Sequence, residues 1–250
     1  MDLSSAFKTT SKLLFGQEIG EMKEFEAYLQ EPVIGKKVKS AFSGKDLWIT
    51  YDHYSENSKF FDYVHEHEKL PTPKLKVDEI KDIDSLFGAV REQLIYSGNK
   101  TLGISESVEN SDHVSDSSYV LNSSIVIKSK FIAYCYLKRN TEYAFASTST
   151  GNSSYVMRCF NATYLKRCFE CSDAANSADL YFCYNLMGCN NCMFSFNLRN
   201  KSNVIGNIPL EREQYSELRK KLLSEMADEL KKNKRLDYSI INLFGNGARA

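Results

Sequence analysis

Residues 132–203 divide into three rows of 24: IAYCYLKRNTEYAFASTSTGNSSY (132–155), VMRCFNATYLKRCFECSDAANSAD (156–179) and LYFCYNLMGCNNCMFSFNLRNKSN (180–203). Four columns keep one type of side chain: aliphatic (Ile132, Val156, Leu180), cysteine (Cys135, Cys159, Cys183), aromatic (Tyr136, Phe160, Tyr184) and asparagine (Asn152, Asn176, Asn200). Self-similarity at a fixed period of this length is typical of a solenoid, whose units bury their apolar faces by stacking on one another.

The repeat extends outward to Gly103 and Asn207, and this stretch contains no proline, whereas all four prolines of the chain lie outside it. Interior strands of a parallel solenoid donate backbone hydrogen bonds to their neighbours, which proline cannot do. We therefore expect a mainly β protein, a right-handed parallel β-solenoid of about four coils with about 24 residues in each coil.

Parallel strands stack about 4.8 Å apart, so residues one period apart should lie above one another. We expect the aliphatic column, which runs from Val108 to Val204, to face the interior, and the aromatic column to stack. The asparagines should form a corner ladder, because asparagine tolerates left-handed backbone angles. Two further columns are predicted to be a second interior column and a serine ladder: Leu121, Phe145, Phe169 and Met193, and Ser105, Ser129, Ser153 and Ser177.

Helical apolar spacing outside the repeat predicts flanking elements. We divide the chain into an N-terminal arm with a small α/β segment (1–78), a capping helix (79–102), the β-solenoid (103–208), a C-terminal capping helix (209–235) and a tail (236–250).

The composition narrows the classes of function. The 250 residues include 32 basic and 32 acidic side chains, so no global field attracts nucleic acid, and a nucleic-acid partner is not expected. No stretch approaches the roughly 20 apolar residues that span a bilayer, and Met1 to Ser5 lack the features of a secretory signal. We expect no membrane partner, and a location in the cytoplasm or within an assembled particle. Seven cysteines, an odd number, favour reduced thiols.

Two C-x2-C pairs separated by seventeen residues form the sharpest chemical candidate, a zinc site with ligands Cys168, Cys171, Cys189 and Cys192. The repeat argues against this site, because the sulfurs of Cys171 and Cys189 would be on the order of 20 Å apart on extended strands. A ladder of buried thiols is the favoured interpretation, without metal or other cofactor, and zinc stays an alternative.

Other candidates for chemistry are weaker. His65 and His67, with His53 upstream, share a face only on a strand. Four carboxylates crowd the first coil, but no column continues them into the acidic groove that a sugar-cleaving solenoid needs: Glu106, Glu109, Asp112 and Asp116. The basic run 231–235 is typical of a helix end. We therefore predict no catalytic residue and no enzyme.

The segment CNNCMFSFNLRNKSNVIGN (189–207), followed by Arg212-Glu213-Gln214-Tyr215, resembles the end of a group of uncharacterised bacterial and phage-type β-solenoid repeat proteins. Phe60-Phe61-Asp62 resembles their region before the repeat, so the resemblance covers about 60–250. Those proteins commonly begin with a cysteine-rich ribbon, whereas this chain has no cysteine before Cys135. The resemblance implies a solenoid fold and no particular activity.

The function predicted from the sequence is a non-enzymatic structural or interaction scaffold, with a virus or phage particle component as the expected setting. Its partners would be proteins, or further copies of the chain, bound through terminal arms at Leu3–Phe15 and Tyr238–Phe244. Two alternatives stay open: a zinc-stabilised binding module, and a carbohydrate-binding or carbohydrate-active solenoid.

Overall fold

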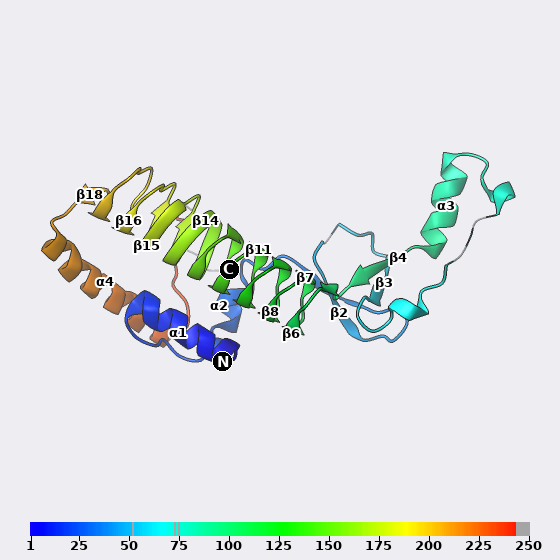
Figure 1. Cartoon of the computed structure of the whole chain (residues 1–250), viewed down its shortest axis with the longest axis horizontal. Helices are drawn as coiled ribbons and strands as arrows, with labels where there is room; N and C mark the ends of the chain where they lie inside the picture. Colours follow the sequence, from blue (N-terminus) through cyan, green and yellow to red (C-terminus); the bar gives the residue numbers. More distant parts are fainter. Residues whose placement is uncertain (52, 73, 75, 244–250) are drawn as a thin grey trace.

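Parallel strands pair at an offset of twelve residues in the computed structural model, which describes residues 1–51, 53–72, 74 and 76–243 (Figure 1). Lys130 pairs with Glu142, and Cys171 pairs with Cys183. Each coil is therefore half as long as predicted, and the solenoid has about nine turns instead of four. The right-handed winding stays a prediction.

The prediction of 24 residues per coil was wrong because alternate coils place different side chains at equivalent positions. Ser147 lies one coil from Cys135 and one coil from Cys159 in the same interior column. Serine and cysteine make equivalent hydrogen bonds there, since each donates to the carbonyl two residues earlier. Residue types therefore recur every 24 positions in the sequence, whereas the backbone structure repeats every twelve.

Most strands of the solenoid have four residues and are separated by two-residue corners, whereas β14 and β15 run through several corners without interruption. The solenoid strands are β5 (Thr101–Leu102), β6 (Glu106–Glu109), β7 (Asp112–Ser115), β8 (Ser118–Leu121), β9 (Ser124–Ile127), β10 (Lys130–Ala133), β11 (Tyr136–Arg139), β12 (Glu142–Phe145), β13 (Thr148–Gly151), β14 (Ser154–Ser172), β15 (Ala175–Tyr184), β16 (Asn190–Met193), β17 (Ser202–Ile205) and β18 (Ile208–Pro209). The last two pair in antiparallel fashion and end the stack.

A left-handed residue recurs at every third position from Ser107 to Gly206. With twelve residues per coil, each coil has four such corners and four sides of three residues. The series includes the β-branched Ile125 at φ 56°, a conformation that is costly for such a residue. Hydrogen bonds between coils repeat at every side and hold the backbone in this conformation.

The prediction of left-handed backbone angles at the asparagines is confirmed, but the prediction that these asparagines stack directly on one another is wrong. Asn152, Asn176 and Asn200 all have positive φ, between 49° and 53°. They are two coils apart, however, so another residue separates each pair. The side-chain bonds join neighbouring coils instead: Asn140 Nδ2 donates to Asn152 Oδ1 at 3.2 Å, and Asn185 to Asn197 at 2.8 Å.

The aromatic column is also interrupted, because Thr148 lies between Tyr136 and Phe160. The series of aromatic rings that does stack has a spacing of twelve residues. Its successive ring centroids lie 4.9, 4.9 and 4.6 Å apart, along Tyr119, Phe131, Tyr143 and Tyr155.

One residue in three points into the solenoid, which decides the core. The aliphatic column faces inward as predicted, with Ile132, Val156 and Leu180 fully buried. The column Leu121, Phe145, Phe169 and Met193 does not, since each member follows an inward residue and points outward. It belongs to a second core, which lies between the outer surface of the coils and the helices.

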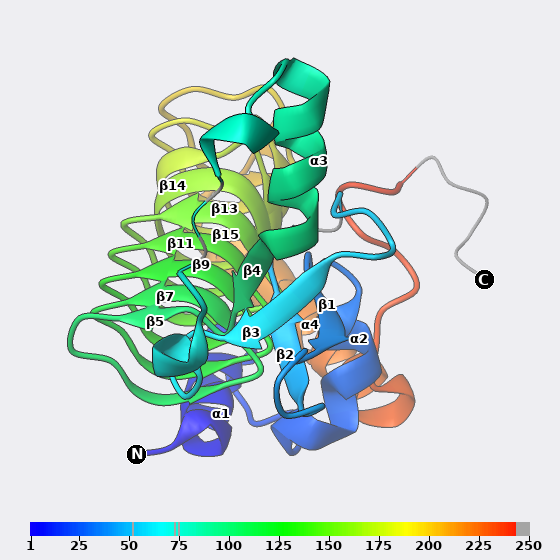
Figure 2. The same cartoon turned by 90° about the vertical axis from the view of Figure 1, so that its right-hand side faces the viewer.

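The helices near the two ends of the chain pack on the outer surface of the solenoid (Figures 1 and 2). Among the described residues the α-helices are α1 (Leu3–Phe15), α2 (Glu26–Gln30), α3 (Ile83–Gln93) and α4 (Arg212–Asn233), and the 3-10 helices are Met22–Phe25, His67–Lys69 and Val77–Glu79. The helix predicted as a C-terminal cap is α4, which runs beside the coils and buries Leu223 and Leu230 against them and α1.

The predicted N-terminal arm is wrong as a free docking element. Helix α1 begins after the N-cap Asp2, whose side chain accepts from Ser5 N, and it ends at Gly16 with φ 75°. Its Phe7 and Leu14 are fully buried and belong to the second core. The apolar side chains of this arm are covered by the chain's own solenoid.

Two small sheets precede the solenoid. Strands β1 (Lys36–Lys39) and β2 (Asp46–Ile49) are antiparallel, and β3 (Lys59–Asp62) and β4 (Ile95–Gly98) are parallel. Trp48 Nε1 donates to Ser124 Oγ at 2.9 Å and joins this region to the coils. The predicted capping helix is α3, which contributes no buried residue and stands apart from the solenoid (Figure 1).

Candidate functional site

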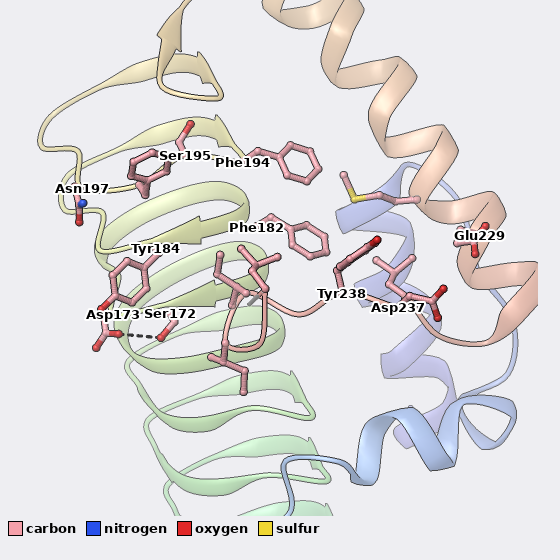
Figure 3. A pocket seen from close by; sticks show the side chains of 16 residues that line it. Ser172, Asp173, Phe182, Tyr184, Phe194, Ser195, Asn197, Glu229, Asp237 and Tyr238 are labelled. Atoms are coloured by element: carbon pink, nitrogen blue, oxygen red, sulfur yellow. Dashed lines mark hydrogen bonds between the residues drawn. The ribbon is translucent and has the colours of Figure 1, made fainter. Parts of the chain in front are cut away.

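A groove of about 1130 Å³ opens between the last coils, helix α4 and the C-terminal segment 236–243 (Figure 3). Its walls come from three parts of the chain that are distant in sequence, and most of its surface is apolar. A concave apolar surface with a few polar groups is the usual form of a binding site.

The solenoid wall of the groove is aromatic. Phe182 and Phe194 occupy left-handed corners one coil apart, and their rings stack at 5.3 Å and 11° and point toward α4 (Figure 3). Tyr184 and Phe196 form a second pair on adjacent coils. Phe196 is 53% exposed, so this row of rings is only partly covered by the chain itself.

The charged side chains of the groove have one sign. Among the described residues that line it, Asp173, Glu229 and Asp237 are acidic and none is basic. Asp173 accepts from Ser172 Oγ at 2.9 Å and from Asn161, and Glu229 accepts from Asn233. Carboxylates beside aromatic faces favour a cation, which both the charges and the ring faces attract.

The third wall is the C-terminal segment, which supplies Tyr238, Ile240 and Leu243 to the lining. Tyr238 and Ile241 are exposed, so the segment predicted as a docking tail is accessible in part. It forms no strand up to Leu243, and Phe244 and the residues from Gly245 onward lie outside the described part of the chain.

Glu170 anchors this segment from inside the second core. Its carboxylate accepts from Ser239 Oγ at 2.7 Å, from Ile240 N at 3.0 Å and from Tyr28 Oη at 3.3 Å. Glu170 is fully buried and also pairs with the guanidinium of Arg158, one coil earlier. One carboxylate therefore joins the solenoid, α2 and the groove wall.

Arg158 completes the buried cluster. It lies 4.1 Å from the centroid of the Tyr28 ring, donates to Tyr28 O at 2.9 Å and pairs with Glu31 at 2.9 Å. Burial acts to lower the pKa of Arg158, but the nearby Glu170 carboxylate outweighs it and raises that pKa. Burial, and then Glu170, raise the pKa of Tyr28 well above its usual value. Arg158 therefore keeps its charge, and the cluster serves as a structural clamp.

The structure does not bring the four candidate zinc ligands together. Leu180 lies between Cys168 and Cys192 in one column, Cys171 pairs with Cys183 in another, and Cys189 follows Ser177 in a third. All seven cysteines are buried free thiols that bond to backbone carbonyls. In the ranges that the structure describes, no group of three or more His, Cys, Asp or Glu side chains could hold a metal ion.

The histidine and carboxylate candidates have local roles. His65 Nδ1 lies 3.1 Å from Asp62, and His67 packs on the ring of Tyr63. Asp112 accepts from Lys100 N and from Thr50, the residue after β2, and so links the solenoid to the N-terminal region. Burial opposes ionisation of Asp112, but its hydrogen bonds outweigh this and lower its pKa.

One buried cation was not anticipated. Lys138 occupies an inward position of β11, is 1% exposed and donates only to its neighbour Tyr136 O at 3.1 Å. Burial lowers its pKa to about 8. One coil further on, the hydroxyl of Thr150 is buried without a hydrogen-bond partner.

The groove residues were missed because the wrong period hid them. Phe182 and Phe194, and Tyr184 and Phe196, are pairs twelve residues apart, which a period of 24 assigns to different columns. The recurrence of aromatic residues at an interval of twelve, half the assumed period, was the signal that could have revealed these pairs.

No protein-family model matches the sequence, and no curated protein matches it significantly. None of the helices in the described ranges is long and apolar enough to cross a bilayer. The groove is therefore interpreted from its own chemistry.

Proposed function

We propose that this protein is a non-enzymatic interaction scaffold that binds an apolar, basic segment of a partner protein in the groove. The proposal rests on a row of partly exposed aromatic rings that lies beside three carboxylates. Asp173, Glu229 and Asp237 line the groove, and none of the described residues that line it is basic. An apolar side chain would pack on Phe194 and Phe196, and a lysine or arginine would lie near the carboxylates.

The solenoid suits such a role mechanically. Each coil is bonded to its neighbours through backbone hydrogen bonds on every side, so the aromatic rings are held on a rigid surface. A binding surface of this kind loses little conformational entropy when it is occupied. Rigid solenoids suit large assemblies, which favours a virus or phage particle as its setting.

The test uses two fluorescein-labelled peptides of ~10 residues, one of alternating leucine and lysine and one of alternating leucine and glutamate. Fluorescence anisotropy should show that the lysine peptide binds with a Kd on the order of 10 µM, and the glutamate peptide should not bind. Equal binding of both peptides would contradict the role of the carboxylates.

Substitutions locate the bound peptide. Phe194→Ser and Phe196→Ser should each weaken binding about tenfold, since each removes an aromatic contact. Phe42→Ser provides the matched control, because Phe42 is also exposed but lies in the N-terminal region. If the groove variants and the control bind alike, the peptide binds elsewhere and the proposal fails.

A further inference from the structure

Helix α3 has an apolar face that its own chain leaves uncovered. Ile83 is 66% exposed and Phe87 is 62% exposed, and Val90 and Leu94 are exposed too. The helix contributes no buried residue and has only 11 residues, with Gly88 at its centre. Isolated helices of this length are marginal in water, and most gain their stability by packing an apolar face.

The spacing of that face is specific. Ile83, Phe87, Val90 and Leu94 follow one another at intervals of four, three and four residues. This alternation is the seam of a two-helix coiled coil, in which such positions meet on one line. The apolar face therefore fits a second helix, and the charges beside it decide between occupants.

We propose that α3 pairs with α3 of a second copy of this chain, in antiparallel orientation. A twofold axis between Gly88 and Ala89 places Phe87 opposite the partner's Val90 and Ile83 opposite the partner's Leu94. The same four residues thus form both halves of the contact, as a twofold symmetric interface requires.

The charges beside the seam select a second copy as the occupant and fix its orientation. Asp84 and Arg91 each follow an apolar seam residue by one position, and both are exposed. In the antiparallel pair Asp84 lies beside the partner's Arg91, and symmetry repeats this ion pair. In a parallel pair the facing positions are Leu86 and Gln93, which offer no charge. The helix is therefore complementary to itself in one orientation.

The position of α3 leaves room for this contact. Figure 1 shows it at one end of the long axis, beyond β3 and β4, whereas the groove lies on the opposite side of the solenoid's midpoint. The interface is short, so we expect a weak, reversible dimer at the low end of the size range for specific contacts. It is independent of binding in the groove.

Sedimentation equilibrium of the full chain tests the proposal. The mean mass should rise from 28.6 kDa at low concentration toward twice that value as the concentration approaches a few hundred micromolar. Asp84→Arg and Arg91→Asp should each weaken the dimer at least about tenfold, because like charges then face each other. Lys128→Asp, a reversal at an exposed solenoid corner, should have no effect.

Mixing the two charge-reversed proteins gives the decisive measurement. An equimolar mixture of the Asp84→Arg and Arg91→Asp proteins should dimerise more tightly than either alone, since every facing pair is then opposite in sign. The double variant should recover the original dimerisation. Because α3 buries nothing in its own chain, circular dichroism and Trp48 fluorescence should be unchanged in all variants. A monomeric mass at every concentration, or a dimer insensitive to these reversals, would overturn the proposal.

Discussion

The guanidinium of Arg158 and the carboxylate of Glu170 form an ion pair across two successive coils, with both side chains buried. A second Arg–acid pair repeats the same offset of twelve residues in a partly exposed place, between Arg167 and Asp179. The two pairs have the same chemistry and differ in burial, so they can be compared directly.

Glu170→Gln should destabilise the protein by about 3–5 kcal/mol, because it leaves Arg158 buried without its main counter-charge. Asp179→Asn, the matched control, should cost less than about 1 kcal/mol, since solvent screens the exposed pair. Urea unfolding followed by circular dichroism measures both. Equal costs for the two variants would show that burial does not control the energy of these pairs.

Lys138→Met should stabilise the protein by about 3 kcal/mol at neutral pH, from the lowering of the lysine pKa from 10.5 to about 8. Below pH 8 Lys138 is protonated in both the folded and the unfolded protein, so the buried charge lowers the free energy of unfolding by its full amount. Between pH 8 and 10.5 the folded protein has lost this proton while the unfolded chain still holds it, so the cost shrinks as the pH rises and is gone above 10.5.

Urea unfolding at several pH values between 7 and 11 therefore checks the sign as well as the size of this effect. The gain from Lys138→Met should shrink as the pH rises. Lys166→Met changes an exposed lysine of β14 and should show no such trend. A gain that is constant with pH would contradict a buried charged lysine.

Ser123→Ala should cost about 1–3 kcal/mol, because Ser123 Oγ accepts from Cys135 N at 3.0 Å and donates to Leu121 O at 2.7 Å. Ser123→Cys should cost less, since cysteine takes the same inward position elsewhere and its sulfur can accept from the next coil, as Cys189 does from Lys201 N. Ser118→Ala, at a partly exposed site, is the control. Equal thermal stability of the alanine and cysteine variants at position 123 would contradict the equivalence of serine and cysteine at this inward position.

The thiols should be unreactive in the native protein and should all react after unfolding. Burial raises the pKa of Cys192 to about 12 and raises that of Cys135 and Cys171, so little thiolate forms near neutral pH. Reaction with a thiol reagent, with and without urea, measures this. Elemental analysis of the same protein is the companion measurement, and one zinc per chain would support the alternative of a zinc-stabilised binding module.

The fold class was predictable because it depends on residue types that recur. Ile132, Val156 and Leu180 lie 24 residues apart and identified an interior column. Residues at this spacing lie above one another whether the interval is one coil of 24 residues or two coils of twelve, so the coil size was not needed. The absence of proline between Gly103 and Asn207 agrees with the parallel pairing that the structure shows.

The coil size and the direction of the outer side chains were not predictable in the same way. Leu121 follows Val120, and a strand that alternates faces gives no warning that one residue in three points inward. That pattern depends on left-handed corners at residues such as Ile125 and Leu137, which local preference disfavours. Contacts between coils determine those corners.

The candidate groove was less predictable than the fold. Its walls join residues 172–197 with α4 and the C-terminal segment, and only the packing of α4 beside the coils brings them together. The sequence indicated an amphipathic helix and an apolar tail, but not the side of the solenoid on which each would lie.

The twelve-residue coil makes the protein a ruler. Each coil adds about 4.8 Å to the length and returns the chain to the same side of the stack. The spacing between α3 and the groove is thus set by an integer, the number of coils between them. Deleting or duplicating one coil would shorten or lengthen that spacing by a single step while leaving both surfaces intact, so the gene can change the reach of the molecule without redesigning either end.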